Sequence, residues 1–175
     1  LIDSGLRCDT NLIVETGSAR NPHHFAVLLG YGATAIYPYL SFELIFELIN
    51  KNNNSNDYTK SVSNYIRGIN KGIFKIMSKM GISCVSSYRG AQLFETVGLD
   101  DDVVDLCFRG TINRISGTDF DDLQKDILET HEFAWDEKLK IKTGGLLKYV
   151  HDDEYHDYNP DVVKQLQECV STGSY

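Results

Sequence analysis

Short apolar runs separated by helical patterns predict a β-α-β unit at the start of the chain. Asn11–Val14 is nearly continuous in apolar residues, which is typical of a strand covered on both faces. Asn21 followed by a proline favours a helix start, and the apolar residues behind it predict a helix over Pro22–Leu29. Ala33–Tyr37 reads as the next strand, which Pro38 ends. We expect the two strands to be parallel.

Two longer apolar patterns predict helices that cover this unit. Ser41–Asn50 holds too many apolar residues for one stripe, so we expect a helix buried on most sides. In Tyr58–Met80 the apolar positions recur every three and four residues, which predicts one long amphipathic helix ended by Gly81. The Asn-rich segment 50–57 between them predicts an exposed loop.

The middle of the chain shows shorter patterns. We expect a buried strand at Ile82–Val85, then a helix over Tyr88–Val97 capped by Ser87 and stopped by Gly98. Asp101–Phe108 reads as a further short helix, because the acidic residues that open it suit a helix N-terminus.

The C-terminal third predicts helices and a small hairpin. The helices are expected at Thr118–Trp135 and from Asn159-Pro160 to Val170, with the hairpin at Leu146–His156. The fold class is therefore α/β, with short, mainly parallel strands alternating with helices and a small C-terminal hairpin and helix. We place a boundary near residue 140, which divides the chain into segments 1–140 and 141–175.

Composition narrows the class of protein. A net charge of −8 over 175 residues argues against a nucleic-acid partner, which rewards a basic surface. The longest apolar stretches fall far below the roughly 18 residues that span a bilayer, so we expect no membrane partner. The chain opens at Leu1 without an initiator methionine, and we expect it to be part of a longer protein.

The residues that usually carry catalysis or metal binding form no recognised pattern. The four cysteines are scattered, so we expect reduced, mostly buried thiols in an intracellular protein, with no choice between cytoplasm and plastid. His23 and His24 are adjacent and point about 100° apart on a helix, which prevents joint chelation. The acidic and histidine residues of 151–156 read as a polar hairpin tip. We therefore expect no catalytic, cofactor-binding or metal-binding residue here.

Two groups of residues are candidate contacts with an anion or a neighbouring domain. The first is a ridge of cations spaced four residues apart on the long helix, and we call it the basic ridge: Arg67, Lys71, Lys75 and Lys79. The second is the turn with Ser86, Ser87 and Arg89, whose hydroxyls and guanidinium suit a carboxylate or phosphate at a helix start. The alternatives are a solvated helix face for the ridge and local capping for the turn.

Several blocks, in one order along the chain, resemble a known family. They are Leu12–Gly17, His23–Ala33, Tyr37–Glu43, Lys75–Ser83 and Ser87–Glu95, with weaker matches at Phe108–Thr111 and Glu154–His156. This series is similar to the large subunit of glutamate synthase, in the later part of its central domain up to the junction with the FMN-binding domain.

The resemblance implies a role within a larger enzyme. Glutamate synthases form L-glutamate from L-glutamine and 2-oxoglutarate, using FMN, an iron–sulfur cluster and electrons from NAD(P)H or ferredoxin. Their partners for this segment would be the glutaminase, FMN synthase and β-helix domains, with a small NAD(P)H-oxidising subunit or ferredoxin as a further partner. The segment would be an interdomain scaffold that binds no cofactor and is inactive alone. The alternative is a free-standing α/β module that binds an anionic metabolite.

Overall fold

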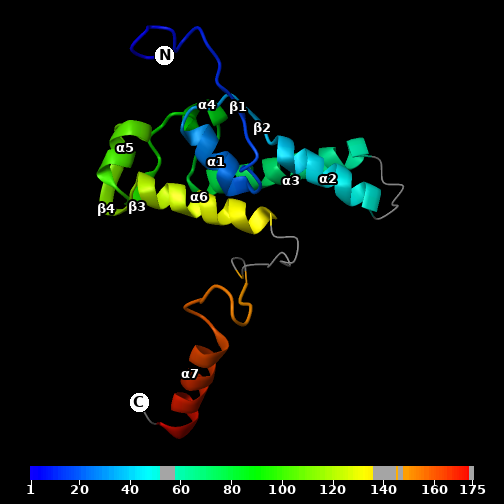
Figure 1. Ribbon diagram of the computed structural model, residues 1–175, viewed down its shortest axis with the longest axis vertical. Helices are drawn as coiled ribbons and strands as arrows, with labels where there is room; N and C mark the ends of the chain where they lie inside the picture. Colours follow the sequence, from blue (N-terminus) through cyan, green and yellow to red (C-terminus); the bar gives the residue numbers. More distant parts are fainter. Residues whose placement is uncertain (52–57, 136–144, 146–147, 174–175) are drawn as a thin grey trace. The chain divides into compact units, whose positions relative to one another are not determined.

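The computed structural model describes residues 1–51, 58–135, 145 and 148–173 (Figure 1). The chain divides into two compact units, Leu1–Asp121 and Asp122–Tyr175. In the first unit short parallel strands alternate with helices, which confirms the α/β class. The expected boundary at 140 falls in a stretch outside the described residues and stays a prediction.

The first unit begins with the predicted β-α-β unit. It consists of β1 (Ile13–Glu15), α1 (Pro22–Gly30) and β2 (Ala35–Tyr37). The strands are parallel, with Val14 opposite Ile36. The Asn21 side chain caps α1 by accepting hydrogen bonds from the amides of the next two non-proline residues, at 3.0 and 3.3 Å. The expectation that the first strand is covered on both faces is wrong, because Ile13 is 72% exposed.

Two helices follow, α2 (Tyr39–Lys51) and α3 (Tyr58–Lys79). Residues 50 and 51 of the expected Asn-rich loop belong to α2, and the rest of that loop, 52–57, lies outside the described residues. The long amphipathic helix is confirmed: α3 packs against both α1 and α2. The core forms where α1 and α3 meet, from Ala19, Phe25, Ala26, Ile69, Ile73, Met77 and Tyr88. The expectation that the second helix is buried on most sides is wrong, since Leu44, Phe46 and Leu48 are all exposed. In the described part of the chain, α3 is the only element against which α2 packs extensively. The three apolar side chains just named are therefore left uncovered.

The next segment differs from the sequence-based expectation. The predicted strand at Ile82–Val85 and helix at Tyr88–Val97 are wrong: the chain forms a one-turn helix, α4 (Val85–Tyr88), and then β3 (Glu95–Leu99). Two left-handed residues, Gly90 (φ 70°) and Gln92 (φ 52°), end any helical path after α4. The Gly90 amide then donates to the Gly30 carbonyl at 2.9 Å, which ties this turn to the end of α1.

A second β-α-β unit closes the first compact unit. Helix α5 (Asp101–Cys107) is confirmed, with the Asp100 side chain accepting from the amide of Asp102 at 3.0 Å. It leads to β4 (Ile112–Thr118), which the sequence did not indicate and which pairs parallel with β3. Gly98 lies inside β3 and does not stop a helix. A Cβ on Gly117 would stand 2.6 Å from the Gly98 carbonyl oxygen, so the two strands approach closely only without side chains there.

The C-terminal region contains two of the expected helices. They are α6 (Phe120–Trp135), which begins at the end of the first unit, and α7 (Pro160–Thr172). The Asn159 side chain caps α7 by accepting from the amides of Asp161 and Val162. The predicted hairpin is wrong as far as it is described: residues 148–156 form turns without strands, and 146–147 lie outside the described residues.

Candidate functional site

The turn around Arg89 has a different geometry from the one predicted. Ser86 and Ser87 lie within the four-residue helix α4, and Arg89 follows its C-terminal end. The expected position of Arg89 at a helix start is therefore wrong, whereas the role of Ser86, Ser87 and Arg89 as contacts for an anion or a neighbouring domain stays a prediction. The reason is the tight turn after α4, where Gly90 and Gln92 adopt positive φ and prevent a longer helix.

The same turn carries a cysteine whose thiol accepts several hydrogen bonds. Cys84 precedes α4, and its Sγ lies 2.9 Å from the Ser86 hydroxyl. This hydrogen bond, together with backbone hydrogen bonds from Ser86 and Ser87, lowers the pKa of the Cys84 thiol. All four cysteines are free, yet Cys8, Cys84 and Cys107 are exposed and Cys169 is half-buried, so the expectation of mostly buried thiols is wrong.

Tyr88 anchors the turn to the core. Its side chain is 1% exposed and packs edge-on against Phe94, with ring centroids 6.5 Å apart. Burial raises the pKa of the Tyr88 phenol, and its hydroxyl has no hydrogen-bond partner among the described residues. The adjacent Arg89 is therefore attached to a fixed point in the core.

The basic ridge lies along the exposed side of α3. All four of its cations are exposed, and Arg67 donates to the Asn64 side-chain oxygen at 2.8 Å. Lys71, Lys75 and Lys79 make no ion pair with any residue in the described part of the chain. Helix α3 contains no Asp or Glu, although the whole chain has 25 acidic residues. The ridge is thus a cationic surface without acidic neighbours on its own helix.

Arg89 shares a cavity with an arginine that the sequence analysis did not single out. Arg89 and Arg7 line the same open cavity of about 600 Å³, together with polar residues that include Thr10, Asn11 and Thr34. The two arginines stand far apart in the sequence, and no local pattern around Arg7 indicated a site. Only the fold brings them together, because the N-terminal segment runs past Gly32, just beyond the end of α1.

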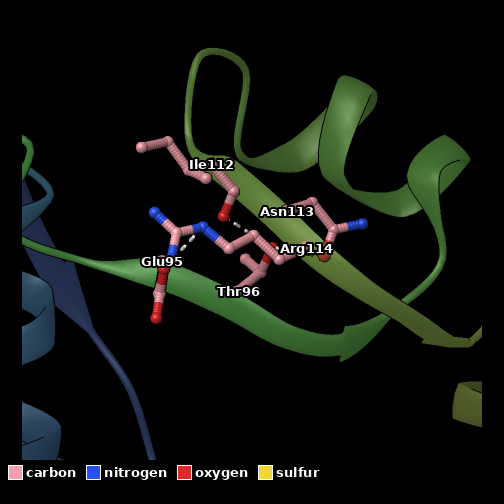
Figure 2. A network of polar contacts seen from close by, with 5 residues as sticks. All are labelled: Glu95, Thr96, Ile112, Asn113 and Arg114. Carbon is pink, nitrogen blue, oxygen red and sulfur yellow. Dashed lines mark hydrogen bonds and ion pairs between the residues drawn. The ribbon is translucent and has the colours of Figure 1, made fainter.

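The β3–β4 sheet carries a connected set of polar side chains (Figure 2). The Thr96 hydroxyl donates to the Asn113 side-chain oxygen at 2.9 Å, with the Ile112 carbonyl at 3.3 Å. The Asn113 amide in turn donates to Asp101 at 2.7 Å and to the Leu99 carbonyl at 3.1 Å. An ion pair joins Arg114 and Glu95 at 3.5 Å. These contacts join the two strands to the start of α5.

The histidines are used locally. His24 Nδ1 accepts from the Arg20 amide at 3.2 Å, and the exposed His151 lies 3.0 Å from Asp152. In the described parts of the chain, no three His, Cys, Asp or Glu side chains are grouped so that they could hold a metal ion. No described helix is both long enough and apolar enough to cross a membrane.

Comparison with known proteins identifies the family. The family model of the glutamate synthase central domain matches residues 1–100. Similar relatives are the glutamate synthase [NADPH] large chain of Bacillus subtilis (40% identical, covering 100% of this chain and 12% of the relative), the ferredoxin-dependent glutamate synthase of Cyanidium caldarium (40%, 100% and 12%) and the glutamate synthase [NADH] of Saccharomyces cerevisiae (41%, 97% and 9%). The chain thus spans only about a tenth of the length of these relatives, and by its match over residues 1–100 it belongs to the glutamate synthase central domain family.

Proposed function

We propose that this chain is an interdomain scaffold within a glutamate synthase large chain. It corresponds to the later part of the central domain and its junction with the FMN-binding domain, and it links the glutaminase and FMN synthase domains. The parent enzyme forms L-glutamate from L-glutamine and 2-oxoglutarate, inside the cell, in the cytoplasm or a plastid. The family match and the similarity to NADPH-, NADH- and ferredoxin-dependent relatives support this assignment.

One observation carries the scaffold role: large apolar side chains are exposed on elements that are otherwise well formed. On α2, Phe46 and Leu48 are 53% and 59% exposed, and on the second sheet Val97 and Ile115 are 66% and 59% exposed. Parallel sheets and apolar helix faces are normally covered by further layers. We infer that neighbouring domains of the large chain, including the β-helix domain, cover these faces.

The cofactors of the parent enzyme belong to other parts of the large chain in this proposal. An iron–sulfur cluster needs closely grouped thiolates, and the described residues do not fit one because the cysteines stand apart in the sequence and no ligand group of three forms around them. FMN and the electron donor, NAD(P)H through a small subunit or ferredoxin, would act at the remaining domains. This segment then supplies positioning and no reaction centre.

The purified chain tests the absence of a reaction centre. We expect it to show no stoichiometric flavin absorbance, no hydrolysis of glutamine and no formation of glutamate. A flavin band at one equivalent per chain would refute the assignment of FMN to other domains. Measurable glutaminase activity would refute the scaffold role.

The basic ridge offers a positive test in the intact enzyme. We propose that Lys71 and Lys75 contact an acidic surface of a neighbouring domain, so reversing both charges should loosen the coupling between the two reactions. We expect the Lys71→Glu/Lys75→Glu enzyme to consume more glutamine per glutamate formed, while synthesis from added ammonia is retained. Lys60→Glu, which changes an exposed lysine of α3 outside the basic ridge, is the control. An unchanged ratio in the double variant would leave the ridge as a solvated helix face.

A further inference from the structure

We propose that the cavity lined by Arg7 and Arg89 binds an oxyanion, a carboxylate or a phosphate group. Both arginines line one open cavity of about 600 Å³, and no acidic residue is among the described residues that line it. The site is separate from the basic ridge, whose residues do not line the cavity. A scaffold needs no ligand, so this inference goes beyond the proposed function.

Arg7 is held in place by backbone carbonyls and keeps donors to spare. Its guanidinium donates to the carbonyl of Thr10 at 3.4 Å and to that of Gly32 at 3.3 Å. An arginine has five N–H donors, so these two bonds orient the group and leave others for a ligand. Gly32 has φ 106°, a conformation open to glycine, and a Cβ there would stand 3.4 Å from the Arg7 guanidinium. The positive φ therefore favours glycine at this position, whereas a Cβ would meet Arg7 only at an ordinary contact distance.

Arg89 is fixed through its backbone and free at its side chain. The residue before it, Tyr88, is buried in the core, and the residue after it, Gly90, donates its amide to the Gly30 carbonyl at 2.9 Å. The Arg89 guanidinium is exposed and makes no hydrogen bond or ion pair with any described residue. A guanidinium fork on an anchored backbone is well suited to bidentate pairing with a carboxylate or phosphate.

The charge around the cavity favours an anion. The chain has more acidic than basic residues, yet this cavity gathers two permanent cations, and the described acidic residues nearest in sequence, Asp3 and Asp9, do not line it. Two like charges at one cavity repel each other, and an anion between them removes that cost. Asn11 and Thr34 add an amide and a hydroxyl to the lining. The oxyanion can come from a free metabolite or from an Asp or Glu side chain of the remaining large chain.

The intact large chain is the material for the test, with inorganic phosphate and succinate as probes. Calorimetric titration at low salt should show binding to the wild type, and Arg89→Gln and Arg7→Gln should each weaken it about tenfold or more. The Arg89→Lys variant keeps the positive charge but loses the forked pair of N–H donors, so its affinity for the probes should lie between those of the wild type and Arg89→Gln. The matched control is Arg20→Gln, an exposed arginine of the same unit that does not line the cavity, and it should leave binding within about twofold.

A second measurement separates the two sources of the anion. If a carboxylate of the large chain already fills the cavity, neither probe binds, and Arg89→Gln lowers the melting temperature of the intact chain more than Arg20→Gln does. That result supports the site with a side-chain occupant, whereas probe binding lost in the arginine variants supports a free anion. The proposal is overturned if the wild type binds neither probe and the two variants melt together, or if binding survives in both Arg89→Gln and Arg7→Gln. None of these readouts depends on the ratio of glutamine consumed to glutamate formed.

Discussion

The two β-α-β units of the first compact unit have the same local design and different surroundings. In β1-α1-β2 the connecting helix packs against α3, and Phe25 and Ala26 of that helix are buried. In β3-α5-β4 the connecting helix has extensive contacts only with its own two strands in the described part of the chain. Its buried residues are Val103 and Val104. In this chain the larger cluster of core residues therefore forms at the β-α-β unit that a second helix covers, and the other unit buries only a few side chains.

The strands and helix of the second β-α-β unit, β3-α5-β4, are joined by polar side chains and not by a large apolar core. Asn113 pairs with Thr96 on the facing strand (Figure 2). Its side-chain amide also donates to Asp101 at the start of α5. The apolar pair across the same sheet, Val97 and Ile115, lies in register but exposed. Stability should therefore depend on apolar packing in the first unit and on hydrogen bonds in the second.

The largest expected loss of folding stability comes from removing a core side chain of the first β-α-β unit. Phe25→Ala should reduce the free energy of unfolding by about 3–5 kcal/mol, because it removes a ring packed between α1 and α3. Leu106→Ala on α5 is the counterpart in the second unit and should cost less than about 0.5 kcal/mol, since Leu106 is 75% exposed. Urea unfolding of both variants measures the difference, and equal losses would contradict the contrast between the units.

The next effect concerns how closely α1 and α3 approach. A Cβ on Gly72 would collide with the ring of Pro22, so Gly72→Ala should destabilise the chain by about 1–3 kcal/mol. Gly68 lies one turn earlier on α3 and has open space around it. Gly68→Ala should therefore stabilise the chain by up to about 1 kcal/mol, through helix propensity alone. Thermal melting gives both signs, and a loss of stability in both variants would argue against the close contact.

The sequence predicted the first β-α-β unit well and the second β-α-β unit poorly, because the two differ in how far their strands are buried. Strand Asn11–Val14 and the Asn21 cap are local signals, and both correspond to elements of the structure. Strand β4 carries Asn113, Arg114 and Ser116, which give no apolar run, and it exists because it pairs with β3. The hydrophobic periodicity of a sequence reflects which side chains are buried, so it does not indicate a strand whose side chains are mostly exposed.

The candidate site shows the same limit. The basic ridge was predictable because helical spacing alone places its members on α3. Arg89 was identified as an anion contact, but with the wrong geometry, since positive φ at Gly90 and Gln92 redirects the chain. Arg7 could not be identified, because its proximity to Arg89 depends on tertiary structure.

A smaller effect tests the polar network of the second unit. Asn113→Ala removes the bonds to Asp101 and to the Leu99 carbonyl, and Thr96 keeps only the Ile112 carbonyl as acceptor. We expect a loss of about 1–2 kcal/mol. Ser116→Ala removes one exposed bond to Asp100 and should cost less than about 0.5 kcal/mol. If both variants unfold at the wild-type urea concentration, the network does not stabilise the second unit.

The smallest effect is that of the exposed ion pair on the same sheet. Glu95 and Arg114 are 3.5 Å apart, with side chains 48% and 71% exposed. A double-mutant cycle with Glu95→Gln and Arg114→Gln should give a coupling energy below about 0.5 kcal/mol that disappears at high salt. A coupling energy above about 1 kcal/mol that persists in salt would show that this pair, and not Asn113, joins the strands.

Hydrogen exchange tests most directly the claim that neighbouring domains cover the open faces. Backbone amides should be compared between the 175-residue chain and the intact large chain. We expect α2 and β4 to exchange more slowly in the intact chain, while the buried stretch of α3 from Ile69 to Met77 changes little. Equal exchange of α2 and β4 in both proteins would contradict the scaffold account.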